Sequence, residues 1–327
     1  MKTKDRVLAF LEKHRGNYIS GVAIAESLEV TRNTVWKAIK QLEAEGYDIE
    51  AVTNKGYRLS ESSYQLSEVG IRETLPDTYN EKAIYYFDKI DSTNKKAKEL
   101  AVEGAEHGTL VVANEQFAGK GRYGRNFESP KDTGIYMSII LKPKELSYRH
   151  PTTLTAYAGV VVSEVVKELT GKELGIKWVN DLYLSGKKVC GILTEAVTDF
   201  ESGEMEWIVL GIGLNVSTAK ESFSEEVKHR AGQIYQASED KVNRNKLVGS
   251  IYQGILEAHL SLSEGEMMKR YREKSIVIGE TVVVQRGNEE SIVTIETIDD
   301  EGQLVIRNKQ GNVETYNSGE IRVILNN

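Results

Sequence analysis

Apolar side chains recur at helical spacing three times within the first sixty residues. The second run follows Ser20 and the third follows Thr31, and Ser and Thr are preferred at helix N-caps. The core-facing positions are Val7, Leu8, Phe10 and Leu11, then Ile24 and Leu28, then Val35, Ile39 and Leu42. After Gly46 the pattern alternates in two strands joined by a turn at 54–56. Three helices and a hairpin predict a winged helix-turn-helix domain over residues 1–60.

The exposed face of the third helix carries side chains suited to DNA. Guanidinium, ammonium, amide and hydroxyl groups read base edges or hold phosphates. Trp36 shares this face, and the hairpin adds Lys55 and Arg58. We predict that the DNA-contacting residues are Thr31, Arg32, Asn33, Thr34, Lys37 and Lys55. The alternative is a helix-turn-helix that serves only packing or dimerisation.

After a polar linker at residues 61–82, strands and helices follow one another in an α+β order. Within the linker, Leu66, Val69 and Leu75 have helical spacing. Downstream we predict strands at 83–87, 109–116, 135–141 and 187–195, and helices from Asp91 towards Val102 and over 152–169. We place a central mixed-sheet domain at 83–270. Alternating segments in the remaining part, 271–327, predict a small β-barrel.

A glycine-rich cationic loop follows the strand at 109–116. Its sequence, GKGRYGR at 119–125, matches the G-x-G-x-x-G pattern of dinucleotide-binding folds. Those folds begin a helix at the third glycine, which Pro130 and Gly134 prevent here. A Walker A loop is also absent, because no Gly-Lys precedes Ser or Thr. The cations at 120, 122 and 125 suit the approach of a phosphate to a carboxylate; the alternative is a solvated surface turn.

Polar residues gather at three further strand ends. The segment DSTN at 91–94 either caps a helix or binds a polar head group. The segment KWVND at 177–181 precedes a hairpin, and GIGLN at 211–215 ends another strand. On the hairpin's returning strand, alternation places Lys188, Cys190 and Ile192 on one face and Val189, Gly191 and Leu193 on the other. A lysine in a strand faces solvent more often than a cleft, so the pattern alone does not select Lys188.

Composition limits the classes of protein. The 327 residues suffice for two or three domains. Residues 1–60 hold ten Lys and Arg against eight Asp and Glu, whereas the rest hold 32 against 41, which indicates two different tasks. A single cysteine cannot form a disulfide framework. The five histidines lack the spacing of metal ligands, so we expect no protein-bound metal. We find neither a signal-peptide pattern nor the about 18 apolar residues of a membrane helix, so we expect a cytoplasmic location without membrane contact.

Five motifs, taken together and in their order along the chain, resemble the motifs of one protein family. They are DSTN at 91–94, EQFAGKGRYGR at 115–125, KWVNDLYL at 177–184, GKKVCGILTE at 186–195 and GIGLN at 211–215. Over essentially its whole length the chain is similar to biotin–protein ligases that are also repressors of the biotin operon. The departures are Val179, where many relatives have proline, and Lys120, where some have arginine.

The resemblance implies an SH3-like C-terminal barrel and a two-step reaction. Biotin and ATP, with Mg²⁺, would form biotinyl-5′-adenylate and pyrophosphate. A lysine of the biotin carboxyl carrier protein of acetyl-CoA carboxylase would then take the biotinyl group. The loop at 119–125 would close over the ligands as a lid. A ligand-promoted homodimer would place two winged helices on two half-sites of operator DNA.

The resemblance also implies roles for individual residues. Those implied to bind biotin are Ser92, Thr93, Asn94, Gln116, Lys120, Gly121, Arg122 and Lys188. Those implied to lie near ATP and the adenylate are Gly119, Arg125, Asn180, Asp181 and Asn215. Lys188 would hold the biotin carboxylate, and both Lys188 and Arg122 would take part in catalysis.

Two alternatives belong to other classes. A lipoate or octanoate ligase-like enzyme would share the core fold, but the winged helix and the GKGRYGR loop argue against it. A biotin-sensing repressor without catalysis is the non-enzyme alternative. Cys190 as an acyl-transfer nucleophile is disfavoured, because no histidine lies near it in the sequence.

Overall fold

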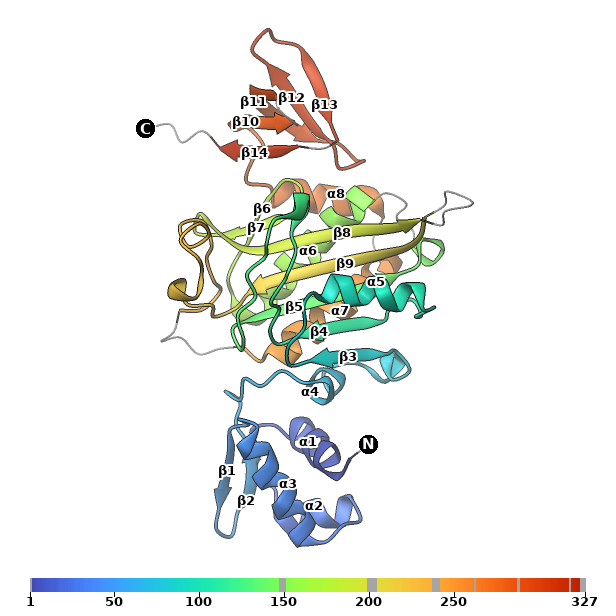
Figure 1. Cartoon of the computed structure of the whole chain (residues 1–327), viewed down its shortest axis with the longest axis vertical. Helices are drawn as coiled ribbons and strands as arrows, with labels where there is room; N and C mark the ends of the chain where they lie inside the picture. The colour runs from blue at the N-terminus through green and yellow to red at the C-terminus, as the bar shows by residue number, and fades with distance from the viewer. Residues whose placement is uncertain are drawn as a thin grey trace.

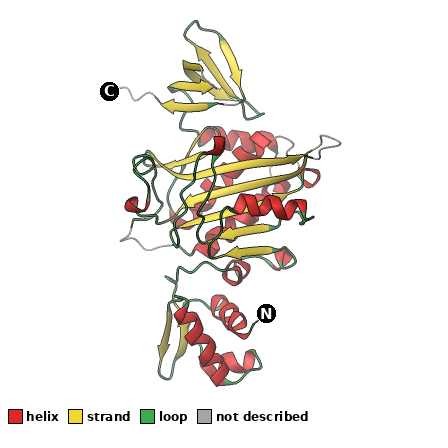
Figure 2. Cartoon of the chain, in the orientation of Figure 1, coloured by secondary structure: helices red, strands yellow, loops and turns green. Residues whose placement is uncertain are grey.

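Three parts follow one another along the longest axis of the molecule (Figure 1). The computed structural model describes residues 2–146, 151–198, 205–236, 242–261, 263–286, 289–317 and 319–323. Helices with a small hairpin form one end, a mixed sheet flanked by helices lies in the middle, and an antiparallel sheet forms the other end (Figure 2). The predicted α+β class is confirmed. No helix within the ranges given is long and apolar enough to cross a membrane.

The N-terminal part is a winged helix-turn-helix, as predicted. Its elements are α1 (Thr3–Lys13), α2 (Gly21–Ser27), α3 (Arg32–Ala44), β1 (Ile49–Val52) and β2 (Gly56–Leu59), the two strands pairing antiparallel. The Oγ of Ser20 caps α2 by accepting a hydrogen bond from Ala23 N at 3.0 Å. Gly56 has a φ of 102°, and a Cβ there would lie 2.0 Å from Ile19 O. Only glycine therefore allows the hairpin to meet the segment before α2.

The central part is built on a seven-stranded sheet in the order β3-β4-β5-β9-β8-β7-β6. Its strands are β3 (Ile84–Phe87), β4 (Leu110–Ala113), β5 (Gly134–Leu141), β6 (Gly175–Lys177), β7 (Asp181–Leu184), β8 (Lys187–Thr198) and β9 (Met205–Asn215). Only β3 and β4 pair in parallel; the other neighbours are antiparallel. Every residue of β5 is buried, as expected for a strand covered on both faces.

Helices cover the two faces of this sheet unequally (Figure 1). On one face α5 (Thr93–Val102) packs Ala97, Leu100 and Ala101 against β4, β5 and β9. On the other face, α6 (Pro151–Thr170) lies against the sheet and against α7 (Arg244–Ser261) and α8 (Glu264–Glu273). The long helix predicted at 152–169 is thus α6. Because the single helix α5 covers only part of its face, polar side chains at its N-terminus can border a cavity.

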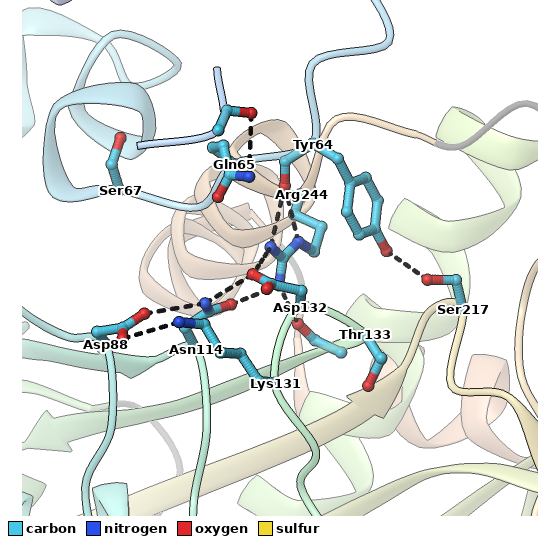
Figure 3. A network of polar contacts seen from close by, with 12 residues as sticks. Tyr64, Gln65, Ser67, Asp88, Asn114, Lys131, Asp132, Thr133, Ser217 and Arg244 are labelled. Carbon is cyan, nitrogen blue, oxygen red and sulfur yellow. Dashed lines mark hydrogen bonds and ion pairs between the residues drawn. The ribbon is translucent and has the colours of Figure 1, made fainter. Parts of the chain in front are cut away.

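A buried arginine ties the segment after the wing to the central part (Figure 3). Arg244 is 1% exposed, and its Nη1 donates to Asn114 Oδ1 at 3.0 Å and Gly134 O at 3.1 Å. Its Nε and Nη2 donate to Tyr64 O at 3.1 and 3.0 Å. A buried cation is tolerated only when its donors are satisfied in this way. The segment predicted as a linker is therefore packed, and it contains α4 (Glu68–Arg72) and a short 3-10 helix at Asp77–Tyr79.

The C-terminal part is a five-stranded antiparallel sheet in the order β13-β12-β11-β10-β14. The strands are β10 (Thr281–Arg286), β11 (Glu289–Ile298), β12 (Leu304–Asn308), β13 (Val313–Tyr316) and β14 (Glu320–Val323). The predicted C-terminal β module is confirmed as an antiparallel β domain, in which no pairing between β13 and β14 is found among the described residues. The boundary placed at 270 falls inside α8. Trp178 Nε1 donates to Gly302 O at 2.9 Å, which connects this sheet to the central part.

Candidate functional site

One cavity of about 550 Å³ collects nearly all the predicted site residues. It lies on the sheet face that carries α5. It is lined by all of the predicted biotin-binding residues, namely Ser92, Thr93, Asn94, Gln116, Lys120, Gly121, Arg122 and Lys188. It is also lined by four of the five residues predicted near the adenylate, namely Arg125, Asn180, Asp181 and Asn215. Residues that are up to 123 positions apart in the sequence thus meet at a single site.

Buried polar side chains form a hydrogen-bond network at the α5 end of the cavity. Ser92 is the N-cap of α5. Gln116 Oε1 accepts from Thr93 N at 2.7 Å and from Thr93 Oγ1 at 3.1 Å. Asn94 Nδ2 donates to Glu195 Oε2 at 2.9 Å. Because Ser92, Thr93 and Asn94 are only 5, 3 and 7% exposed, this end of the cavity can bind a polar group away from bulk water.

The cationic loop borders the cavity with Lys120, Arg122 and Arg125. Lys120 and Arg125 are exposed, and Arg122 is half-buried. Arg122 Nη1 donates to Asn180 Oδ1 at 3.2 Å, and Lys120 Nζ donates to Asn126 Oδ1 at 3.3 Å. Long exposed cations with such contacts can turn towards an anion at small cost. Electrostatically, this end of the cavity suits phosphate and carboxylate groups.

Gly119 is the one predicted site residue of the central part that does not line the cavity. A Cβ at this position would lie 2.5 Å from Phe127 O, so glycine is needed for a close backbone approach. The ring of Phe127 in turn lies over two glycines of the sheet. A Cβ on Gly213 would be 2.5 Å from that ring, and one on Gly191 would be 3.3 Å from it. Gly119 thus shapes the loop, and the glycines of β8 and β9 form a flat floor.

Lys188 faces the cavity, on a different side from the one that alternation predicts. Its Nζ lies 3.3 Å from the position of a Cβ on Gly191, so Lys188 and Gly191 share a face. A β-bulge between β7 and β8 causes the error, because one extra residue reverses the alternation. Cys190 and Ile192 are fully buried. Lys188 Nζ pairs with Asp181 Oδ1 at 2.5 Å, as an ion pair rather than an aligned hydrogen bond.

Two further cavity residues are neutral at physiological pH. Burial raises the pKa of the Cys190 thiol far above its usual range, although the nearby Lys188 ammonium lowers it. Burial, followed by the Asp181 carboxylate, raises the pKa of Tyr183 to about 12. A buried protonated thiol is a poor nucleophile. The chemistry of this site therefore depends on its cations and hydrogen-bond donors, and a covalent role for Cys190 is disfavoured.

Asn215 is the last residue of β9, and one of its two side-chain amide atoms is hydrogen-bonded within the protein. Its Nδ2 donates to Gly232 O at 3.0 Å. Its Oδ1 is buried and has no hydrogen-bond partner within the part of the chain that the structure describes. Because a buried carbonyl oxygen without a donor is costly, this atom is suited to accept from a bound molecule.

Three residues of the site escaped sequence reasoning. Ser138 Oγ lies within 2.6 Å of Asn94 Oδ1, Glu195 holds the Asn94 amide, and Phe127 covers the glycine floor. Ser138 could have been noticed in the sequence, because it is the one serine in the strand GIYMSIIL, whose other residues are apolar or aromatic. Glu195 and Phe127 had no such signal, since their partners lie far away in the sequence.

Apart from Lys55 on the wing, the predicted DNA-binding residues lie on α3 or at its N-cap. Arg32, Asn33 and Lys37 are exposed, and Trp36 is 49% exposed beside them. Thr31 is exposed but caps α3, since its Oγ1 accepts from Thr34 N at 3.1 Å. The cap occupies the Thr31 hydroxyl, so its role in DNA contact is limited to its remaining hydrogen-bonding capacity.

Of the two cations on the wing, Lys55 is more available for contact with DNA than Arg58. Lys55 lies at the exposed tip, 5.5 Å from the centre of the Tyr18 ring. Arg58 Nη2 donates to Glu50 Oε1 at 2.6 Å, and its guanidinium lies 4.6 Å from the same ring. Because Arg58 is held by a carboxylate and a ring, Lys55 is the better candidate for phosphate contact.

Three family models match the chain in the order of its three parts. A helix-turn-helix domain model matches residues 3–58, the biotin/lipoate A/B protein ligase family matches 86–215, and the biotin protein ligase C-terminal domain matches 277–323. The fold and the cavity therefore define a protein ligase of the biotin/lipoate class that carries an N-terminal helix-turn-helix.

Relatives of this architecture match nearly the whole chain. The bifunctional ligase/repressor BirA of Bacillus subtilis is 34% identical over 96% of this chain and 97% of its own. That of Escherichia coli is 29% identical over 94% and 93%. The biotin protein ligase from Aquifex aeolicus, solved with biotin and ATP, has a TM-score of 0.64 at 28% identity and covers 74% of this chain and 99% of its own. The chain belongs to the BirA family of bifunctional ligase/repressors, which confirms the resemblance of its motifs.

Proposed function

We propose that the cavity binds biotin with its ureido ring at the α5 end and its carboxylate towards Lys188, beside the α-phosphate of ATP. One observation carries this proposal: a single cavity joins a buried, hydrogen-bonding end to an end rich in cations. The first suits a neutral polar ring, and the second suits two anions that must approach each other. Asn180, Asp181 and Asn215 would lie along the adenylate.

The first step forms a mixed anhydride. A biotin carboxylate oxygen attacks the α-phosphorus of ATP, the bond from that phosphorus to the bridging oxygen breaks, and pyrophosphate leaves. The Lys188 ammonium orients the carboxylate, and the Arg122 guanidinium neutralises charge on the α-phosphate. No group of three His, Cys, Asp or Glu in the described ranges could hold a metal. Mg²⁺ would therefore arrive on the ATP phosphates and supply further charge neutralisation.

The second step consumes the anhydride. The lysine of a biotin carboxyl carrier protein, in its amine form, attacks the carbonyl carbon, and AMP leaves. The loop at 119–125 protects the adenylate from water until the acceptor arrives. We place this reaction in the cytoplasm.

The winged helix would give the same chain a second role, as a repressor of the biotin operon. A homodimer formed with ligand bound would present two copies of α3 to two operator half-sites. Sedimentation with and without biotin and ATP measures this dimerisation.

Exchange of labelled pyrophosphate into ATP tests the ligase. We expect exchange that depends on biotin and is not supported by lipoate or octanoate at the same concentration. Absence of exchange with biotin would refute the ligase proposal, and equal exchange with octanoate would assign the site to a different acid.

A further inference from the structure

Asn94 presents its amide to the cavity, and both of its amide atoms are hydrogen-bonded by other residues of the protein. Its Nδ2 donates to Glu195 Oε2 at 2.9 Å and, more weakly, to Leu193 O at 3.5 Å. Its Oδ1 accepts from Ser138 Oγ at 2.6 Å, and Ser138 Oγ is also 2.8 Å from Thr93 Oγ1. Neither Glu195 nor Ser138 lines the cavity. We call Glu195, Asn94 and Ser138 the amide clamp.

The clamp fixes which way the Asn94 amide points. A carboxylate can only accept hydrogen bonds, whereas a hydroxyl can donate or accept. Exchanging the nitrogen and oxygen of Asn94 would set its carbonyl against the Glu195 carboxylate, which is repulsive, while Ser138 could tolerate either arrangement. Glu195, the closer and charged acceptor, therefore contributes most to the orientation; the Leu193 carbonyl oxygen supports it with a longer contact, and Ser138 supports it with a donor.

A lysine outside the cavity holds Glu195 in place. Lys98, on α5, donates from Nζ to Glu195 Oε1 at 2.9 Å, which leaves Oε2 for Asn94. The Glu195 side chain is 32% exposed, and of the two side chains that hydrogen-bond to it among the described residues, Asn94 lines the cavity and Lys98 does not.

The fixed orientation gives the ligand an acceptor. The Asn94 oxygen lies directly above the floor of the cavity, since a Cβ on Gly211 would be 2.0 Å from it. A carbonyl oxygen has two lone pairs, and Ser138 uses one. The second can accept an N–H from a ligand, and a cyclic urea carries two such donors.

We propose that Glu195 and Ser138 are positioning residues that make Asn94 an acceptor for a ureido N–H and so set selectivity for biotin. This inference rests on the proposed ligase function and adds to it the origin of recognition at the ring. The reacting carboxylate and ATP lie at the other end of the cavity, so the clamp acts on biotin binding and not on the chemical step.

A donor–acceptor swap tests the clamp in the intact protein. In Glu195→Gln the side chain can donate as well as accept, so Asn94 loses the main acceptor that fixes its orientation and keeps only the longer contact with Leu193 O. We expect the KM for biotin in pyrophosphate exchange to rise about tenfold, with kcat and the KM for ATP within about twofold of wild type. Asn94→Asp alone places two carboxylates together, and we expect a rise of about a hundredfold.

The double variant Asn94→Asp with Glu195→Gln restores a donor opposite an acceptor and leaves a carboxylate oxygen facing the ligand. We expect its KM for biotin to recover to within about tenfold of wild type. Glu99→Gln, which removes an exposed carboxylate of α5 paired with Lys96, is the matched control and should change nothing. If Asn94→Asp does not fold, Ser138→Ala replaces it, with an expected rise of about threefold.

The outcomes separate the two proposals. Wild-type protein without biotin-dependent exchange refutes the ligase function. Wild-type exchange combined with an unchanged KM for biotin in Glu195→Gln refutes the clamp alone. A double variant no better than Asn94→Asp, or equal rises in the KM values for biotin and ATP, also refutes the clamp, since a merely structural role predicts those results.

Discussion

At the α5 end of the cavity, polar side chains are buried and held by protein partners, whereas the loop carries two exposed cations and a half-buried one. Thr93 and Asn94 each make hydrogen bonds that fix their geometry. Lys120 and Arg125 are exposed on the loop. A rigid network discriminates between ligands because its donors and acceptors are arranged before binding. In the proposed function, the cationic loop instead admits two anions and then closes over them. Under the proposed function, one cavity thus separates recognition from chemistry.

The largest expected effect tests the chemical end. Lys188→Ala removes the ammonium that lies in the cavity beside Asp181. We expect kcat for biotin-dependent exchange to fall by about a thousandfold, because a charge that stabilises the transition state is lost. Lys187→Ala is the matched control. Lys187 precedes Lys188 on the same strand but is exposed and does not line the cavity, so exchange should persist. Similar rates for Lys188→Ala and Lys187→Ala would remove Lys188 from the mechanism.

The same substitution at two glycines compares the ends directly. In Gly211→Ala the new Cβ would lie 2.0 Å from Asn94 Oδ1, so the network must move. We expect the KM for biotin to rise about a hundredfold, since recognition depends on that geometry. Gly124→Ala in the loop meets open space, although its φ of 73° strains alanine. We expect a change in the KM for biotin of about threefold or less there. Equal effects would show that the two ends do not differ in rigidity.

A smaller effect is expected at the winged helix, outside both ends of the cavity. Arg32→Ala removes an exposed cation at the start of α3. We expect operator binding to weaken about tenfold, while biotin-dependent exchange stays unchanged. A gel-shift titration at fixed salt measures the first quantity, and unaltered affinity would exclude Arg32 from the interface. Loss of pyrophosphate exchange in Arg32→Ala would instead show that the ligase activity also depends on the winged helix.

The smallest effect is expected on thermal stability, at Asp91, the residue before Ser92 at the N-terminus of α5. The hydrogen bond from Lys95 lowers the pKa of the Asp91 carboxyl below its usual value. A lowered folded-state pKa adds stability above the unfolded-state pKa, and this is lost as the pH falls through the folded-state value. Asp91→Asn should therefore lower Tm slightly at pH 7 and make no difference in strong acid. A difference in Tm that persists below the folded-state pKa would assign the effect to packing.

Local signals predicted many elements correctly. Ser20 and Thr31 cap α2 and α3 as their types suggest, and the apolar run at 152–169 became α6. These predictions succeeded because capping and amphipathic spacing act within one helix. The face of Lys188 was predicted wrongly, since a bulge depends on how β7 pairs with β8. The packing of the linker likewise depends on partners far along the chain, such as Arg244.

The sequence by itself determined the α+β class, the order of the three parts and the family, because motif spacing and periodicity are written along the chain. Only the tertiary structure decided that the α5 N-terminus, the cationic loop and Lys188 share one cavity. It also decided that Glu195 and Ser138 act on Asn94. The physical reason is that hydrogen-bond direction and burial depend on contacts between strands and helices that a one-dimensional pattern does not contain.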